Sequence, residues 1–415
     1  MEVALSKKRT IKVSAPGKLI LFGEHAVVYG KTALAACLTD LRTTMSIERQ
    51  KGDSLHISAS IIGVSHISFS ISDILSCLSN TEFLKETRPL DDTTVPVVDA
   101  QVISLIEQHV KERIDKLNVE MSSLSEAPSP MTPMTNMAKF AYPTAEKLIV
   151  EDSRLVSLVA IIYIYLYLNK QDEKFPSFKF SMSSNLPIGA GLGSSSSFSV
   201  CLASCLLYQR NIDVEKNLDM VNKWSFLAEQ LIHGTPSGID NAVGTYGGVV
   251  AFSMGKIQRQ ISKIPNLRIL IVNTKVSRNT RVIVGKVRTK HDADPINMKE
   301  KFNRIEEIAA TCIQHFEDQE PNSQSILSKL IQDNHILLNE IGAGHEKLDQ
   351  VVLIASSLGY SAKLTGAGGG GCAYVLLQDQ DEDRENVLKS QLEKTGFECY
   401  VSGIGGKGIR RELNF

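Results

Sequence analysis

The sequence predicts an α+β protein built of two domains. Its 415 residues suit two domains of ordinary size, and 43% of them are hydrophobic, which is enough for two cores. Stretches that alternate apolar and polar residues indicate strands, and longer stretches with apolar residues at helical spacing indicate helices. We place the boundary near Gly255, just after a predicted strand, so the expected domains are residues 1–255 and 256–415.

In the first domain, most of the expected strands precede the expected helices. Pro16 and Gly17 interrupt the first alternating stretch, which therefore predicts two short strands. Residues 121–143 are rich in Ser, Pro, Met and Thr, and they predict an irregular, mobile loop. The expected strands are residues 11–15, 18–23, 43–49, 54–60, 178–182 and 246–252, and the expected helices are residues 101–118, 155–168, 198–207 and 221–233, with a short one opening near residue 240.

The second domain again mixes the two kinds of element. It is expected to open with a hydrophobic strand, to continue with three amphipathic helices, and to contain a second glycine-rich loop between two strands. A charged helix and a short strand then end the chain. In order, these elements are residues 267–272, 295–316, 325–341, 348–357, the loop at 366–371, 381–395 and 398–401.

Composition excludes several classes of protein. Lysine and arginine number 45 and aspartate and glutamate 46, so the chain lacks the basic excess typical of nucleic-acid or membrane-surface binding. The seven cysteines are scattered and odd in number, which favours reduced thiols in a cytoplasmic protein. The longest apolar run, residues 155–168, is too short to span a membrane. Residues 1–9 are too short and too charged for a signal peptide.

Residues 186–197 are the most informative stretch. Gly189, Gly191 and Gly193 alternate with small or apolar residues, four serines follow, and an apolar stretch typical of a buried helix comes next. Alternating glycines let the backbone approach an anion closely, and the free N–H groups and serine hydroxyls at a helix start attract one. The stretch therefore predicts a phosphate-binding loop. A flexible linker is the alternative, but the apolar residues of the loop disfavour it.

Two better-known phosphate motifs do not explain this chain. A P-loop that ends at Gly30, Lys31 and Thr32 would need a glycine where His25 stands. A dinucleotide-type glycine pattern occurs at residues 403–408, but it lies too near the C-terminus for the helix and strand that must follow it. That pattern predicts a turn between short strands.

Three charged residues fit phosphoryl transfer beside the loop. Glu229 lies in an otherwise apolar helix and, with Ser195, offers the hard oxygen ligands that suit Mg²⁺. Asp240 stands in a tight turn that opens a helix, where it could act as a base. Lys18 lies among strand residues that should be buried, so it needs a partner such as Asp240 or a phosphate. Singly, each has a plainer explanation: a solvated helix face for Glu229, a helix cap for Asp240, and a lysine that reaches solvent for Lys18.

Residues 187–195 resemble the phosphate-binding signature of the GHMP kinases, a family of small-molecule kinases. Within the family, further motifs resemble the branch that phosphorylates mevalonate, and they follow the family's order over nearly the whole chain. These motifs are residues 15–28, 232–241, 273–280 and 363–372. The resemblance implies an α/β N-terminal domain and a ferredoxin-like α+β C-terminal domain, with the active site in the cleft between them. It also implies ATP and Mg²⁺ as cofactors.

The resemblance implies a role for individual residues. Asp240 would be the catalytic base with Lys18 beside it, and Ser195 and Glu229 would hold Mg²⁺. The residues that would bind ATP are Lys18, Ser184, Gly189, Ala190, Gly191, Leu192, Gly193, Ser194 and Ser195. The residues that would surround mevalonate are Glu24, His25, Arg278 and Thr280.

The resemblance further implies a cytoplasmic homodimer that prenyl diphosphates could inhibit. The sequence departs from the family at Thr235, where asparagine is common, and at residues 60–63, where a nucleotide-binding asparagine of relatives has no match. The adenine pocket is therefore left unassigned. Two alternatives stay open: another GHMP kinase such as phosphomevalonate kinase, which should have more basic residues near the substrate motif, and a non-catalytic ligand sensor, which should lack the base, the lysine or a metal ligand.

Overall fold

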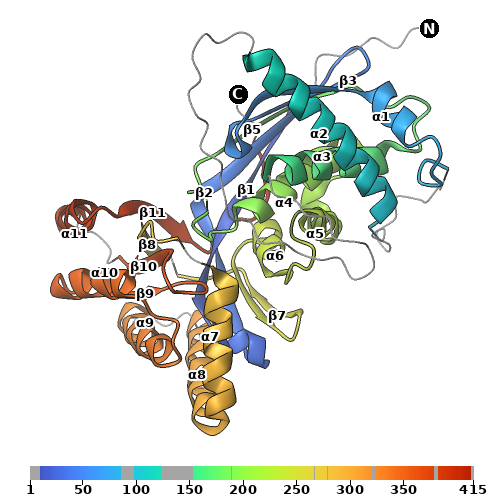
Figure 1. Cartoon of the computed structure of the whole chain (residues 1–415). Coiled ribbons are helices and arrows are strands. Elements are labelled where there is room, and N and C mark those ends of the chain that lie inside the picture. The colour runs from blue at the N-terminus through green and yellow to red at the C-terminus, as the bar shows by residue number, and fades with distance from the viewer. Residues whose placement is uncertain are drawn as a thin grey trace.

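The computed structural model describes residues 10–85, 98–122, 153–187, 189–265, 267–277, 279–318, 323–377 and 382–412. Figure 1 shows two groups of helices and strands: an upper group, blue to green, from the first part of the chain, and a lower group, orange and red, from the last part. Long blue strands run from the upper group into the lower one and join them. This arrangement is the two-part mixture of helices and strands that the sequence predicts.

The long strands are β1 (Thr10–Phe22) and β2 (Ala33–Arg49), which pair antiparallel along most of their length. The predicted break at Pro16 and Gly17 is wrong, because β1 continues through both residues and only its register shifts between Pro16 and Lys18. Proline has no N–H to give to a strand ladder, and such an irregularity is one of the few places inside a sheet that tolerates it. The long-range pairing with β2 therefore outweighs the local signal for a break.

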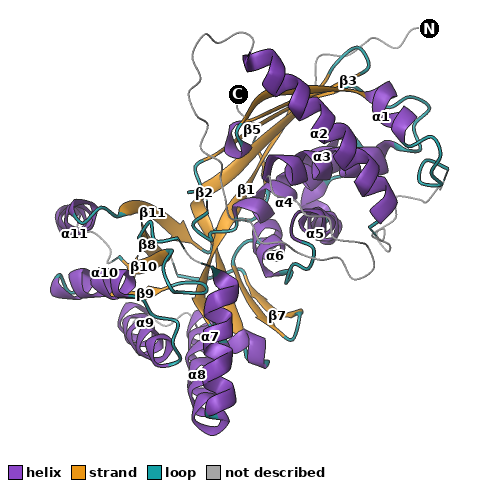
Figure 2. Cartoon of the chain, in the orientation of Figure 1, coloured by secondary structure: helices purple, strands orange, loops and turns teal. Residues whose placement is uncertain are grey.

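The upper group contains the strands that extend the sheet beyond β2, together with the helices that pack on them. Strands β3 (Ser54–Ala59), β4 (Val64–Ser70) and β5 (Phe178–Ser184) extend the sheet, with β3 parallel to β5 and β5 antiparallel to β2. Figure 2 shows the helices gathered on one side of these strands. They are α1 (Ile71–Cys77), α2 (Ala100–Ser122), α3 (Ser153–Asn169), α4 (Ser194–Gln209), α5 (Leu218–His233) and α6 (Ile239–Tyr246).

Helices α3 and α4 form the centre of the upper core. Both are buried along almost their whole length, as the sequence predicts for residues 155–168 and 198–207. α4 begins earlier than predicted, at Ser194, so the serines of the glycine-serine stretch form its first turn. Because α4 packs on β1, β2 and α5, the loop before it is held between a strand and a helix that are both fixed in the core.

The lower group has its own strands and helices. Its strands are β8 (Leu267–Asn273), β9 (Ser361–Leu364), β10 (Cys372–Leu376) and β11 (Glu398–Ile404). Its helices are α7 (Thr280–Ala293), α8 (Pro295–Asp318), α9 (Ser323–Glu340), α10 (Glu346–Ser357) and α11 (Glu382–Lys394). Of these five helices, α7 alone was not predicted from the sequence. Its first turns hold β-branched residues and a glycine, which are poor helix formers, and only Ile283 and Val287 of its apolar residues are buried.

The two groups share one sheet. β6 (Val249–Ser253) pairs with β2 and with β7 (Lys256–Ile261), and Gly255 lies in the turn between β6 and β7. A domain boundary at this turn remains a prediction. β12 (Arg410–Arg411) returns the end of the chain to β1, and the main path of the sheet is β4-β3-β5-β2-β11-β8-β10-β9.

Several smaller predictions can be compared with the structure. The seven cysteines are free thiols, as predicted. The glycine pattern at residues 403–408 forms a turn between β11 and β12, also as predicted. Of the loop predicted at residues 121–143, the first two residues belong to α2, and residues 123–143 lie outside the described residues. Within the described ranges, no helix is both long enough and apolar enough to cross a membrane.

Candidate active site

The glycine-serine loop connects β5 to α4. Gly189, Gly191 and Gly193 have φ values of 71°, 77° and 75°, a backbone conformation that residues with a side chain rarely adopt. Gly189 and Gly191 are exposed, whereas Ala190 and Leu192 between them are only 3% and 2% exposed. The apolar residues therefore anchor the loop in the core, and the glycine backbone faces outward. A Cβ built on Gly189 would meet no atom within 4 Å, so there is open space beside the loop.

The loop ends at the N-terminus of α4. Gly193 is the residue before the helix, and the half-buried Ser194 and Ser195 form its first turn. N–H groups in the first turn of a helix have no partner within the helix and carry partial positive charge. Together with the glycines, this helix start is suited to binding the phosphates of a nucleotide.

Ser184 lies at the other end of the loop. Its hydroxyl accepts a hydrogen bond from the N–H of Leu186 at 3.2 Å and lies 3.0 Å from the hydroxyl of Thr43. The Thr43 hydroxyl also contacts that of Ser197 in α4, at 2.7 Å. Thr43, which the sequence did not single out, therefore links the two ends of the loop. The structure shows Ser184 bracing the loop, and its direct contact with ATP stays a prediction.

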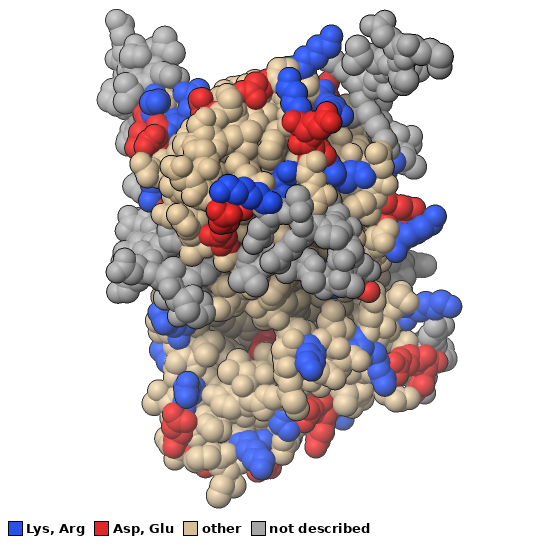
Figure 3. Space-filling view, turned by 90° about the vertical axis from the view of Figure 1, so that its right-hand side faces the viewer, with Lys and Arg blue, Asp and Glu red and all other residues tan. Residues whose placement is uncertain are grey.

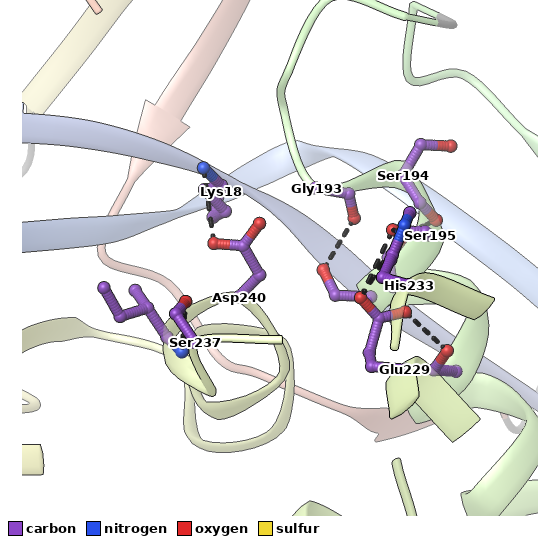
Figure 4. Close-up of polar contacts among 12 residues, drawn as sticks. Lys18, Gly193, Ser194, Ser195, Glu229, His233, Ser237 and Asp240 are labelled. Carbon is purple, nitrogen blue, oxygen red and sulfur yellow. Dashed lines mark hydrogen bonds and ion pairs between the residues drawn. The ribbon is translucent and has the colours of Figure 1, made fainter. Parts of the chain in front are cut away.

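Lys18 and Asp240 form an ion pair beside this loop (Figure 4). Lys18 comes from β1, and Asp240 comes from the first turn of α6, which Gly238 opens with a φ of 87°. The Lys18 Nζ lies 3.3 Å from the Asp240 Oδ1, with the lysine side chain 12% exposed and the aspartate 38% exposed. The backbone N–H of Lys18 donates to the carbonyl of Leu192 at 2.8 Å. β1 thus holds Lys18 directly against the loop, and Lys18 pairs with an accessible carboxylate from α6.

Glu229 occupies a buried polar centre between α4 and α5. Its carboxylate accepts hydrogen bonds from the hydroxyls of Ser195 at 3.3 Å and Ser199 at 2.8 Å (Figure 4). Burial raises the pKa of Glu229 to about 8 despite the opposing effect of the Ser199 hydrogen bond, and the charge of Asp240 adds to the rise. Without a bound cation, the buried Glu229 side chain therefore favours its neutral, protonated form.

Among the described residues, no neighbour of Glu229 offers a positive charge that would favour its ionised form. His233 Nε2 lies 2.9 Å from the Ser195 hydroxyl and 3.8 Å from the Glu229 carboxylate, but burial lowers the pKa of His233, which favours the neutral ring. In the described part of the chain, no lysine or arginine lies within 4.0 Å of this carboxylate. The Glu229 carboxylate and the Ser195 hydroxyl are hard oxygen ligands, and this pair of ligands fits Mg²⁺. The described residues contain no group of three or more His, Cys, Asp or Glu that could hold a metal, so phosphate and water would complete the coordination.

The two polar centres belong to one electrostatic environment. The charge of Asp240 raises the pKa of both Glu229 and His233, which places the ion pair and the buried carboxylate close to each other, as Figure 4 shows. Figure 3 shows that the surface is hollowed at the height where the upper and lower groups meet, with an acidic side chain inside the hollow. The junction between the two groups is therefore open to solvent on this face.

Two of the residues predicted to bind the alcohol substrate, His25 and Thr280, lie near the second glycine loop, residues 366–371. His25 Nε2 lies 2.8 Å from the carbonyl of Ala367. Because a carbonyl only accepts, His25 carries its proton on Nε2, and burial lowers the pKa of the ring. Thr280 is exposed at the start of α7, which packs closely against Gly369 of the same loop. Arg278 lies outside the described residues. For Glu24 the structure shows a buried carboxylate, and contact of these residues with substrate stays a prediction.

Besides Thr43, sequence reasoning missed two further residues that hold the predicted ones in place. Ser199 donates to Glu229 from one turn beyond Ser195, a spacing that could have been read from the helix periodicity. Lys363 is a fully buried lysine in β9 that pairs with Glu24. A lysine among buried strand residues was the signal that selected Lys18, and the same signal could have selected Lys363.

Comparisons with known proteins agree with this geometry. The family model of the GHMP kinases N terminal domain matches residues 158–248, which include the glycine-serine loop, Glu229 and Asp240, and the GHMP kinases C terminal model matches residues 316–396. Mevalonate kinase of Homo sapiens is 34% identical to this chain over an alignment of 415 positions. The alignment covers 96% of this chain and 93% of the human protein. The chain belongs to the GHMP kinase family.

Solved structures of other GHMP kinases share the fold. A crystal structure of a mevalonate kinase superposes with a TM-score of 0.65 at 24% identity, covering 95% of this chain and 99% of that one. The L. major mevalonate kinase in complex with R-mevalonate has a TM-score of 0.62 at 21% identity, covering 97% and 98%. The predicted two-part GHMP kinase fold is confirmed, and membership of the family implies that the chain is a small-molecule kinase that uses ATP.

Proposed function

We propose that this GHMP kinase transfers the γ-phosphoryl group of ATP to the C5 hydroxyl of (R)-mevalonate, giving 5-phosphomevalonate for isoprenoid and sterol synthesis. The observation that carries the proposal is the Lys18–Asp240 pair at the edge of the glycine-serine loop, because it puts an accessible carboxylate and a cation beside a phosphate cradle. The name of the human relative and the R-mevalonate bound to the L. major neighbour support mevalonate as the alcohol.

The glycine-serine loop would bind the ATP. The backbone from Gly189 to Gly193 and the first turn of α4 would hold the phosphates, and Lys18 would contact the transferring group. Ser195 and Glu229 would hold Mg²⁺, which would neutralise phosphate charge. The Ser195 and Glu229 side chains contact each other at 3.3 Å, and a bound cation would favour the charged form of Glu229, which supports this assignment.

Asp240 would act as the general base. Its side chain is 38% exposed and can reach a bound hydroxyl. The carboxylate takes the proton of the C5 hydroxyl as the oxygen forms a bond to the γ-phosphorus. The bond from that phosphorus to the bridging oxygen breaks, and ADP leaves with the electron pair. Lys18 keeps Asp240 oriented and stabilises negative charge on the transferring group.

The alcohol would lie between Asp240 and the second glycine loop. His25 has a neutral ring whose Nε2 is engaged with Ala367, so its Nδ1 can accept a hydrogen bond from a substrate hydroxyl. Thr280 at the start of α7 and the neighbouring Arg278 would contact the rest of the molecule, with Glu24 next to His25. Arginine suits the carboxylate that mevalonate carries.

A substrate panel tests the proposed function. ADP release is measured with mevalonate, phosphomevalonate, homoserine and galactose, each against a sample without alcohol that gives the background ATPase rate. We expect mevalonate to give the highest kcat/KM by a wide margin. A preference for phosphomevalonate would assign the chain to the other kinase of the family, and no ADP release above background with any alcohol would identify a ligand sensor.

We also propose that each chain consists of two domains, residues 1–255 and 256–415, and that two copies of the chain form a homodimer in the cytoplasm. Prenyl diphosphates would inhibit this enzyme. The family resemblance and the seven free thiols support a reducing compartment. A prenyl diphosphate would place its phosphates on the glycine-serine loop, so inhibition should be competitive with ATP. Light scattering tests the dimer, and initial rates at several ATP concentrations test the competition.

A further inference from the structure

A buried ion pair connects the end of β1 to β9. Glu24 follows β1, Lys363 lies in β9, and their side chains are 1% and 0% exposed. The Lys363 ammonium donates to the Glu24 Oε1 and, at 3.0 Å, to the carbonyl of Leu21. Burial lowers the pKa of Lys363, and Glu24 is the group that opposes this effect. The buried Lys363 ammonium therefore depends on Glu24 to remain charged inside the protein.

The second oxygen of Glu24 is also occupied. The Asn334 side-chain amide, from α9, donates to Glu24 Oε2 at 3.2 Å. The carbonyl oxygen of the same amide, Asn334 Oδ1, is buried and finds no donor among the described residues. With both oxygens engaged and almost no exposed surface, the Glu24 carboxylate is positioned to hold protein segments together.

The ion pair stands at the base of the predicted alcohol site. The Tyr374 hydroxyl of β10 donates to the Leu21 carbonyl at 3.2 Å, and the Thr365 hydroxyl donates to the Ile20 carbonyl at 2.8 Å. The end of β1 is thus tied to β9 and β10, the two strands that carry the second glycine loop. His25 comes directly after Glu24 and contacts that loop at Ala367.

We propose that Glu24 and Lys363 are positioning residues: their ion pair fixes the end of β1 against β9 and so sets His25 against the second glycine loop, without either side chain contacting the alcohol. This role replaces the substrate contact that the sequence suggests for Glu24. The effect on the alcohol rests on the proposed function, whereas the effect on stability does not. The nucleotide loop at residues 189–195 belongs to other elements and should be unaffected.

A double-mutant cycle tests this inference. Lys363→Met leaves the buried Glu24 carboxylate without its cation, and Glu24→Gln leaves the buried ammonium without its anion. In the double variant both charges are gone, the glutamine amide can satisfy both polar atoms of Asn334, and Tyr374 still donates to the Leu21 carbonyl. Replacing both members of a buried pair is far better tolerated than removing one. Arg259→Met, which breaks an exposed long-range pair with Glu317, is the matched control.

Thermal unfolding and kinetics are measured on the parent, the two single variants, the double variant and the Arg259→Met control. We expect each single variant to lower the melting temperature and to raise the KM for mevalonate by about tenfold or more, equivalent to ~1.4 kcal/mol, while the KM for ATP stays at the parental value. The double variant should recover most of both losses. A melting temperature and a KM that recover together support the positioning role.

Two results would overturn the inference. If the double variant regains its melting temperature but keeps the raised KM of Glu24→Gln, the carboxylate itself contacts the alcohol. If Lys363→Met has the same melting temperature as the Arg259→Met control, the ion pair does not hold the strands together. Should a single variant fail to fold, recovery in the double variant still decides the question. A parent inactive on mevalonate would refute the proposed function, while the melting temperatures would still test the pair.

Discussion

Neutralising Asp240 should separate catalysis from stability. Asp240→Asn keeps the shape of the side chain and removes its charge and its basicity. The Asp240 Oδ1 lies 3.3 Å from the Lys18 Nζ, and two unit charges at that distance in water attract each other by about 1 kcal/mol. Because the Asp240 side chain is 38% exposed, solvent screening leaves at most ~1 kcal/mol of stability to lose. General-base catalysis is typically worth about 10²–10⁴-fold, or ~3–5 kcal/mol of barrier.

The assay combines turnover with Lys18→Met in a double-mutant cycle. Asp240→Asn should lower kcat by about 10²-fold or more with ATP affinity little changed, and Lys18→Met should be comparably severe because it removes charge stabilisation as well as the partner of the base. Since the two residues act as a unit, the double variant should be scarcely worse than the poorer single one. Circular dichroism verifies folding, and Asp219→Asn, another aspartate in the first turn of a neighbouring helix, is the control expected to keep parental kcat.

Fully multiplicative losses in the cycle would show that Lys18 and Asp240 act independently. Near-parental kcat in Asp240→Asn would remove Asp240 from the role of base. Loss of ATP affinity in that variant, measured by calorimetry, would mean that the carboxylate supports the nucleotide site and not the alcohol.

Three further predictions follow from the same geometry. Glu229→Gln should keep the fold, strongly lower kcat and raise the Mg²⁺ concentration needed for half-maximal rate, whereas Glu393→Gln, on an exposed helix face, should not; an unchanged Mg²⁺ dependence would exclude Glu229 as a ligand. Gly191→Val, at a φ of 77°, should impair ATP binding in calorimetry and spare mevalonate binding, whereas Gly396→Val, at a φ of 90° far from the loop, should spare both. Burial lowers the pKa of His335 below 6.5, so on acidification this histidine takes up a proton in the unfolded chain before it does so in the folded protein. The free energy of unfolding should therefore fall as pH drops below about 6.5. His335→Gln should lessen that fall in urea titrations at pH 7.5 and 5.5, and an equal fall in both proteins would be evidence against the histidine.

The phosphate loop could be predicted from sequence because its physics is local. Backbone conformation at Gly189, Gly191 and Gly193, the apolar anchors between them and the serines at a helix start all lie within one short stretch. Helices α3 and α4 are buried over long runs, so their hydrophobicity alone identified them. Lys18, Asp240 and Glu229 were selected as residues out of place in their surroundings, and the structure brings all three together with the loop.

The rest depends on contacts between distant parts of the chain. β1 runs through Pro16 because β2 pairs with it, which a local break signal cannot show. The Glu24–Lys363 pair joins residues 339 positions apart, so no local pattern reveals that Glu24 is buried and paired. α7 was missed for the opposite reason, since its start is a poor helix former and tertiary packing of Ile283 and Val287 compensates.

Identification of the product tests the proposed reaction most directly. The protein is incubated with ATP, Mg²⁺ and racemic mevalonate, and phosphorus NMR with mass spectrometry follows the mixture, with Asp240→Asn in a parallel sample. We expect a phosphomonoester coupled to the C5 methylene protons, formed in the same amount as ADP, consuming the R enantiomer only and absent from the Asp240→Asn sample. ADP accompanied only by inorganic phosphate, phosphate on another hydroxyl, or equal product from the Asp240→Asn protein would contradict the mechanism.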